Sequence, residues 1–397
     1  MNIFDEIEKH RKDMIELISR IVEIPAISPK GGGEGEEKRA SFLKKFLEEK
    51  GFDVKEFIYK DDLGFNRPNL VVNYGNKDRT IWFVIHIDTV SPGDLSLWQS
   101  DPFKAVVKDN KIYGRGTNDD GQPIASAIYA LITLRDLKID PKYNFGIALV
   151  SDEEFGSEYG IKRLIKENIF KNNDMVIVPD AAFKDGKQIE IAEKSILWLK
   201  FIVKGKQVHA STPQEGINAT KVMAKLINDL NQLYEKFNLE NELFNPRIST
   251  FEPTKCEKNL DTINIIPARN EFYFDSRILP EYKVDEIIDY INEIRRNVEK
   301  ETKASIDMEI ISKEESGPTT RKDSEIVKLL SNAIKELRGF EPVPIGIGGG
   351  TVAKDFRKMN IDTVVWFTGE DVAHQPNEYI NIDDMVNDAK VFAKLFI

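Results

Sequence analysis

Residues 144–154 read NFGIALVSDEE, an apolar run that ends abruptly in three consecutive acids. The run from Phe145 to Val150 has the length and composition of a strand that is buried on both faces. The acids that follow repel one another, since two like charges about 4 Å apart cost roughly 4 kcal/mol at an effective dielectric constant near 20. Either these carboxylates lie in bulk water, or a positive group lies among them.

Strands and helices alternate on both sides of this run. TIWFVIH at 80–86 and DMVIVPD at 174–180 are also apolar without polar alternation, as in buried strands. Residues 122–137 carry Ile124, Ile128 and Leu131 on one helical face. This alternation predicts an α/β fold whose mainly parallel sheet is covered by helices.

The pattern changes after residue 187 and resumes near residue 316. The elements between have the order β-α-β-β-α-β, which is typical of a small antiparallel, ferredoxin-like sheet with two helices on one face. We therefore expect one domain at 1–187 and 308–397, with an α+β domain inserted at 188–307. The elements expected in the insertion are a strand at 188–205, a helix at 219–237, strands near 247–251 and 261–278, a helix at 284–302 and a strand at 305–312.

Composition excludes several classes of partner. The 397 residues are enough for two domains, and the net charge of −11 without a basic stripe argues against nucleic acid. The single cysteine, Cys256, rules out an intrachain disulfide and fits a reducing compartment. The first 25 residues have the spacing of an amphipathic helix and not of a signal peptide, and no apolar run reaches the roughly 18 residues of a membrane span. We expect a cytoplasmic protein that binds neither membranes nor nucleic acid.

Polar residues cluster just beyond the predicted strands or in loops. The carboxyl ends of strands in open α/β sheets gather functional groups, so His86, Glu153, Glu154 and Asp180 should converge. Two histidines and at least three carboxylates in one crevice suit a metal site, and this many donors suggests two ions that share a bridging ligand. The segments concerned are HID (86–88), GRGTNDDG (114–121), SDEE (151–154), VPD (178–180) and AHQPNE (373–378).

With these segments in this order, the chain resembles the M20 family of two-zinc amidohydrolases over essentially its whole length. That family includes acetylornithine deacetylase, succinyl-diaminopimelate desuccinylase, carboxypeptidase G-type enzymes and dipeptidases. The resemblance implies two Zn²⁺ ions in the domain at 1–187 and 308–397, which Co²⁺ or Mn²⁺ can replace. It also implies a cis peptide bond at Asp119–Asp120. The implied ligands are His86 and Asp180 for one zinc, Glu154 and His374 for the other, and Asp119 as the bridge.

The same resemblance implies the remaining roles at this site. Asp88 would orient the ring of His86, and Glu153 would be the general base. Zinc lowers the pKa of its water toward about 7 and polarises the scissile carbonyl, so that a carboxylate alongside can pass the water's proton to the leaving amine. Because consecutive side chains point in different directions, Glu154 can bind a metal ion while Glu153 faces the water.

The inserted domain resembles the family's lid and dimerisation domain. In GKQVHASTPQEGINA (205–219), His209 would stabilise the oxyanion, in dimeric members from the partner subunit. INIIPARNEFYFDSR (263–277) nominates Asn264 and Arg277 as substrate ligands, although Arg277 can equally form a structural ion pair. We expect a homodimer through this domain.

The loop GIGGGTVAK (346–354) lacks the spacing of a phosphate-binding P-loop. Its exposed backbone N–H groups, including that of Gly350, and the Thr351 hydroxyl would instead bind a substrate carboxylate.

The substrate class stays open. Desuccinylases and acetylornithine deacetylases commonly read Gly-Gly-Thr-Ser-Asp-x-Arg at this loop, whereas here Ala353 and Asp355 take the aspartate and arginine positions. The segments GRGTNDDGQP and VPDAAF resemble those of dipeptidases more closely. However, the 120 residues at 188–307 make a smaller lid than that of dipeptidases. We expect hydrolysis of the amide bond of small carboxylate-bearing N-acyl amino acids. The alternatives are a dipeptidase or carboxypeptidase, and a catalytically silent homologue that binds metabolites or partners.

Overall fold

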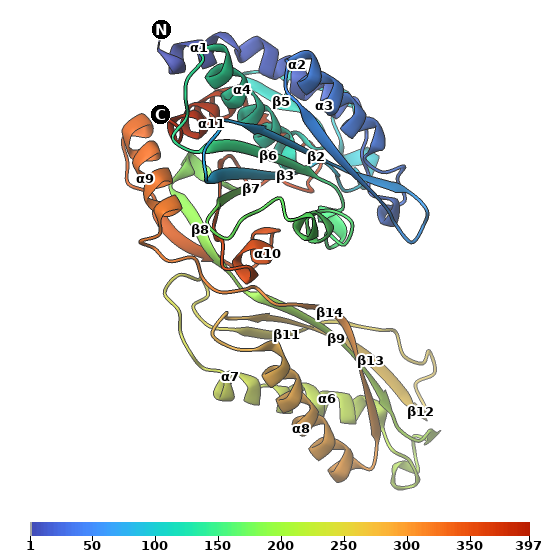
Figure 1. The fold of residues 1–397 in the computed structure, drawn as a ribbon. Coiled ribbons are helices and arrows are strands. Elements are labelled where there is room, and N and C mark those ends of the chain that lie inside the picture. The colour runs from blue at the N-terminus through green and yellow to red at the C-terminus, as the bar shows by residue number, and fades with distance from the viewer. Residues whose placement is uncertain (1) are drawn as a thin grey trace. The chain divides into compact units, whose positions relative to one another are not determined.

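The structure is a computed structural model that describes residues 2–397 (Figure 1). The chain divides into two compact units. The first unit contains the residues up to Ile191, Thr320–Pro344 and Thr351–Ile397. The second contains Ala192–Thr319 and Ile345–Gly350.

The larger sheet has eight strands in the order β1-β2-β6-β3-β7-β16-β8-β15. Its central strands β6, β3, β7 and β16 are parallel, and β1 and β2 add an antiparallel edge. The predicted α/β fold with a mainly parallel sheet is therefore confirmed. The strands are β1 (Val54–Lys60), β2 (Asn66–Tyr74), β3 (Thr80–His86), β6 (Asn144–Val150), β7 (Met175–Phe183), β8 (Gln188–Glu193), β15 (Val343–Ile347) and β16 (Asp362–Thr368).

The central strands are apolar because both faces of the sheet are covered. Every residue of β3 and β6 is buried. On one face, the ring of Phe145 stacks on those of Phe83 and Phe396 at centroid distances of 4.9 and 4.3 Å. On the other, Trp82 and Val84 belong to a core cluster that includes residues of the helices α5 (Ile161–Leu164) and α10 (Ala353–Lys358).

Eight α-helices belong to the first unit among the described residues. The N-terminal segment is two helices instead of the single one expected, because the chain leaves helical geometry at His10. Helix α5 is only four residues long, since Gly156 and Ser157 adopt left-handed backbone conformations that hold the preceding turn out of the helix. The helices are α1 (Ile3–Lys9), α2 (Arg11–Val22), α3 (Glu37–Glu49), α4 (Gln122–Asp136), α5 (Ile161–Leu164), α9 (Glu325–Arg338), α10 (Ala353–Lys358) and α11 (Ile382–Lys394).

A small three-stranded sheet, which sequence reasoning missed, joins distant parts of the first unit. Its strands are β4 (Val106–Lys108), β5 (Lys111–Tyr113) and β17 (Tyr379–Asn381), in the order β17-β5-β4. Tyr379 pairs with Tyr113 across β17 and β5. This pairing brings the GRGTNDDG and AHQPNE segments side by side.

The second unit has a four-stranded antiparallel sheet in the order β11-β13-β9-β14. The expected strand at 188–205 is two strands, which separate at Lys194, whose buried ammonium donates to the carbonyls of Pro246 and Ile248. The expected helix at 219–237 breaks at Asn231. The elements are β9 (Ser195–Lys204), β10 (Val208–His209), α6 (Ala219–Leu230), α7 (Gln232–Lys236), β11 (Thr250–Cys256), β12 (Ile265–Ile266), β13 (Arg269–Ile278), α8 (Val284–Thr302) and β14 (Ser305–Glu314).

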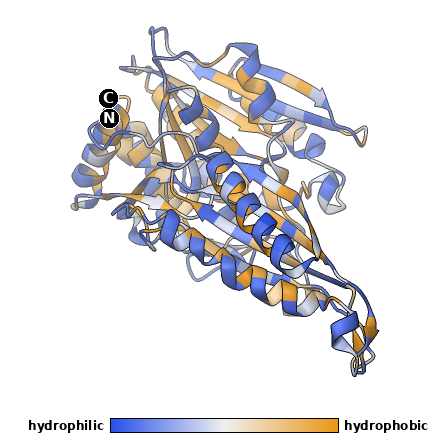
Figure 2. Cartoon of the chain, turned by 90° about the horizontal axis from the view of Figure 1, so that it is seen from below, coloured by the Kyte–Doolittle hydropathy of each residue, from blue (hydrophilic) through white to orange (hydrophobic). Residues whose placement is uncertain are grey.

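Periodic hydrophobic residues explain how the second unit packs. Figure 2 shows hydrophobic and hydrophilic residues alternating around its long helices. Leu226 of α6 and Ile291 of α8 belong to the same buried cluster as the inward residues Leu199 and Phe201 of β9. Among residues 2–397, no helix combines the length and apolar character that crossing a bilayer requires.

Candidate metal centre

The site lies where neighbouring parallel strands of the first unit end. β3 ends at His86, β6 ends just before the acidic triplet, and β7 carries Asp180 in its second half. β3 pairs with both β6 and β7 in parallel, so the three segments leave the sheet at the same edge. The topology therefore gathers these polar groups, as expected for an open α/β sheet.

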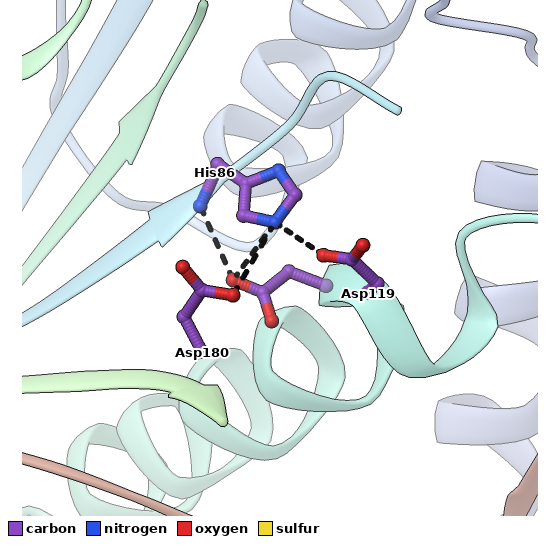
Figure 3. A group of neighbouring side chains, drawn as sticks. His86, Asp119 and Asp180 are labelled. Atoms are coloured by element: carbon purple, nitrogen blue, oxygen red, sulfur yellow. Dashed lines mark hydrogen bonds and ion pairs between the residues drawn. The ribbon is translucent and has the colours of Figure 1, made fainter. Parts of the chain in front are cut away.

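A first group of possible ligands surrounds His86 (Figure 3). Its ring Nε2 lies 2.6 Å from Oδ1 of Asp119 and 3.8 Å from Oδ1 of Asp180. Asp120, which sequence reasoning did not nominate, places Oδ2 3.6 Å from the same nitrogen. One ligand atom from each of these four residues lies within 4.8 Å of the others. The only sequence signal for Asp120 was its place directly after Asp119.

A second group consists of Asp119, Glu154 and His374. His374 Nε2 lies 3.0 Å from Oδ2 of Asp119 and 3.1 Å from Oε2 of Glu154. The two oxygens of Asp119 thus face different imidazoles, Oδ1 toward His86 and Oδ2 toward His374. The peptide bond between Asp119 and Asp120 is cis, as the family resemblance implied.

The chemistry of these residues fits a pair of divalent cations. Imidazole nitrogens and carboxylate oxygens suit zinc, and also cobalt or manganese. Oδ1 of the buried Asp120 has no hydrogen-bond partner in the described part of the chain, which leaves a lone pair without compensation. Burial raises the pKa of Asp180 well above its usual range, and the Asp120 carboxylate raises it further. A bound cation would provide a partner for Oδ1 of Asp120 and would stabilise the ionised form of Asp180.

The pKa of Asp119 is shifted in the opposite direction to that of Asp180, because two imidazoles lie beside it. Burial works against its ionisation, but His86 and His374 outweigh burial and hold the pKa of Asp119 well below its usual range. Hydrogen bonding to Asp119 and then Glu154 raises the pKa of His374 to about 10. Asp119 is therefore the anionic centre that both histidines share.

Asp88 connects the first group to the acidic triplet. Its fully buried carboxylate accepts hydrogen bonds from the backbone N–H groups of Glu153 and Glu154, at 3.0 and 3.1 Å. Oδ1 of Asp88 also lies 3.5 Å from His86 Nδ1, and its backbone carbonyl oxygen lies 3.1 Å from that nitrogen. These contacts favour the tautomer with hydrogen on Nδ1, which leaves Nε2 free to bind a cation.

The three acids of the triplet have separate environments. Asp152 is fully buried and lies 3.2 Å from the Arg67 guanidinium. Glu154 faces His374, while Glu153 begins a short 3-10 turn, and burial raises the pKa of its carboxyl to about 8. The sequence predicted that a positive group could lie among these three acids. For Asp152 this group is the Arg67 guanidinium, and nothing in the local sequence indicated that Arg67 would lie there.

The other residues nominated from sequence belong mostly to the second unit. His209 is exposed on β10, and its Nδ1 lies 2.7 Å from the Ser211 hydroxyl. Asn264 is exposed, and its carbonyl accepts a hydrogen bond from the backbone of Ala210. Their side chains therefore have room to meet a ligand.

Arg277 and the glycine loop are already in contact. The Arg277 guanidinium pairs with Asp275 at 2.9 Å and donates to the carbonyl of Gly348 at 3.0 Å. Gly350 is exposed, whereas Thr351 is buried and its hydroxyl accepts from the backbone N–H of Ala353. Arg277 thus forms an ion pair on its own strand, and its role toward a substrate stays a prediction.

Known proteins with similar sequences or folds cover nearly the whole chain. The model of the family described as Peptidase family M20/M25/M40 matches residues 82–397. An uncharacterized metallohydrolase of Methanocaldococcus jannaschii is 42% identical over 97% of this chain and 98% of its own length. A succinyl-diaminopimelate desuccinylase of Wolbachia pipientis is 28% identical over 94% of this chain and 90% of its own. The M20 family metallo-carboxypeptidase of Sulfolobus solfataricus has a TM-score of 0.78 at 21% identity, covering 96% of this chain and 98% of its own.

Proposed function

From the premise that this chain belongs to peptidase family M20/M25/M40 and is a hydrolase, we propose that it is a two-zinc enzyme that cleaves the amide bond of small carboxylate-bearing N-acyl amino acids. The observation that carries this proposal is the position of Asp119, whose two oxygens face His86 and His374 from the two ligand groups. A single carboxylate between two sets of nitrogen and oxygen donors suits a bridging ligand.

The protein's own residues account for the proton transfers. Bound cations would polarise the amide carbonyl and make a water molecule more acidic. Glu153 accepts a proton as that water attacks the carbonyl carbon, and then delivers the proton to the leaving nitrogen. Asp88 supports this step because it holds the backbone of Glu153 and Glu154 in place. His209 would stabilise the oxyanion, and Asn264, Arg277, Gly350 and Thr351 would bind the substrate.

The Glu153→Ala variant tests the general base. We expect it to retain its metal ions and to lose at least about 100-fold in kcat, because positioned proton transfer contributes on that order. Metal content and kcat should be measured together. Glu158→Ala is the matched control, since the Glu158 carboxylate is exposed and pairs with Lys162. Turnover by Glu153→Ala at the wild-type rate would refute the assignment.

A substrate panel separates the deacylase proposal from its alternatives. The Wolbachia desuccinylase supports a deacylase, whereas the peptidase family and the altered GGTVAKD loop favour a dipeptidase or carboxypeptidase. The zinc-loaded protein should be offered N-acetylornithine, N-succinyl-diaminopimelate and a set of dipeptides. We expect turnover of an N-acyl amino acid. Turnover of dipeptides alone would contradict the first choice, and no turnover of any compound would favour the silent binding homologue.

We also propose that the enzyme is a cytoplasmic homodimer, that residues 188–307 form the lid and that the dimer assembles through it. Support comes from β14, an edge strand of the second unit's sheet that begins inside this range at Ser305. Ile310 and Ile311, which follow the range on the same strand, are 49% and 52% exposed. Exposed apolar edges favour pairing with another strand. Light scattering should then give twice the 45.4 kDa chain mass. A mass of 45.4 kDa would contradict the dimer.

A further inference from the structure

Glu378 is a buried carboxylate with an unusual number of donors directed at it. It is fully buried, immediately before β17, and its carboxylate accepts from the backbone N–H groups of Gly116, Asn118 and Asp119 at 3.0, 2.8 and 3.1 Å. Three backbone donors from one loop converge on one side chain. The carboxylate therefore shapes the whole turn that leads into Asp119.

Arg115 completes the arrangement from the other side. Its guanidinium, 2% exposed, forms an ion pair with Glu378 at 2.6 Å. A second nitrogen of the same group donates to the backbone carbonyl of His374 at 3.2 Å. Arg115 thus binds both the Glu378 carboxylate and the backbone of His374. The pairing of β17 with β5 brings the segment of Arg115 beside the segment of His374 and Glu378.

The contacts of this pair reach Asp119, which both ligand groups share, and His374, which belongs to the second group alone. Glu378 holds the backbone of Asp119, and Arg115 holds the backbone of His374. Within residues 2–397, neither side chain forms a hydrogen bond or ion pair with His86 or Asp180, which β3 and β7 position. Loss of the pair would disturb the group of Asp119, Glu154 and His374 and leave two donors of the other group in place.

We propose that Arg115 and Glu378 are positioning residues that set the affinity of the second cation, the one held by Asp119, Glu154 and His374, selectively over the first. This inference rests on the proposed two-cation site. It assigns a function to a buried ion pair that, among residues 2–397, hydrogen-bonds to the ligand residues only through their backbone. Residues that orient metal ligands typically change metal affinity by about 10- to 100-fold when they are replaced.

The test is a calorimetric titration of metal-free full-length protein with Zn²⁺, repeated with Co²⁺ while its absorption spectrum is recorded. We expect two binding steps in the wild type. Glu378→Gln, which keeps the shape but loses the charge, should weaken one step by about 10- to 100-fold and leave the other within about twofold. Arg115→Lys should weaken the same step less, since lysine keeps the charge but cannot bridge Glu378 and the His374 carbonyl as a planar fork does.

Asp174→Asn is the matched control. Asp174 is also a buried carboxylate, and it accepts hydrogen bonds from the backbone N–H groups of Thr80 and Lys171. It lies immediately before β7, whereas the metal site lies where the strands end. This variant should lose stability while both binding steps stay unchanged.

The outcomes separate the inference from the function on which it rests. The positioning role alone would be overturned if Glu378→Gln bound both cations with wild-type affinity. It would also be overturned if Glu378→Gln and Asp174→Asn both weakened the two binding steps equally. Fewer than two steps in the wild type would overturn the two-cation site and the inference with it. If Glu378→Gln does not fold, Arg115→Lys provides the test. Wild-type affinities for both binding steps in Arg115→Lys would then refute the proposal.

Discussion

At the scale of single residues, buried charges organise the acidic triplet. Arg67 lies among three carboxylates, at 2.5 Å from Glu36, 3.2 Å from Asp152 and 3.4 Å from Asp61. The side chains of Arg67, Glu36 and Asp152 are fully buried. Removal of the Arg67 guanidinium would leave the carboxylates of Glu36, Asp152 and Asp61 uncompensated in a low-dielectric environment.

We therefore predict that Arg67→Met lowers the free energy of unfolding by about 3–5 kcal/mol, as does the loss of one partner from a buried ion pair. Urea denaturation measures this change. The matched control is Arg20→Met, because Arg20 is 58% exposed and pairs only at the surface with Glu23. The control should change by less than about 1 kcal/mol. Equal effects of the two substitutions would show that Arg67 contributes nothing beyond a surface pair.

At the scale of elements, close packing between strands decides which residues the central sheet accepts. Gly146 of β6 lies opposite Trp82 of β3 in the parallel ladder. A Cβ atom at Gly146 would come within 2.3 Å of the Trp82 ring. The indole therefore occupies the space that a side chain on β6 would need.

We predict that Gly146→Ala lowers the free energy of unfolding by about 1–3 kcal/mol, the usual cost of overpacking a core. Gly349→Ala is the control, because a Cβ atom there meets no atom of the described residues within 4 Å. The control should stay within about 0.5 kcal/mol of the wild type. A Gly146→Ala protein as stable as the control would mean that the Trp82 ring moves aside at little cost.

At the scale of the whole molecule, the candidate ligands all belong to the first unit, while the second unit has its own hydrophobic core. Cations that bind only the folded first unit stabilise it by mass action, by about 4 kcal/mol at a thousand times the dissociation constant. The two units should therefore respond differently to metal removal.

We predict that chelation abolishes activity and that hydrogen exchange then rises at the carboxyl ends of β3 and β7 but not in β9 and β13. The physical reason is that repulsion among Asp119, Asp120 and Asp180 is no longer neutralised. Hydrogen exchange on the wild-type protein, before and after chelation, measures this. Activity that survives chelation, or exchange that rises equally in both units, would contradict the prediction.

The sequence by itself determined the elements whose signals are local. β3 was expected at 80–86 and α8 at 284–302, and the structure has both with these bounds, because an unbroken apolar run and a helical period are readable within one segment. The donors at the strand ends were nominated in the same way. The short helix α10, the three-stranded sheet and the breaks at His10, Lys194 and Asn231 were not, since contacts and backbone geometry set them.

Only the tertiary structure decided which charged groups meet. Glu154 and His374 are 220 residues apart in the chain, and Arg115 and Glu378 are 263 apart. Asp120 joined the ligand group and Arg67 met Asp152 without any local pattern that distinguished them from surface residues. The physical reason is that hydrophobic period and composition belong to a segment, whereas the partner of a buried charge depends on how distant segments pack against one another.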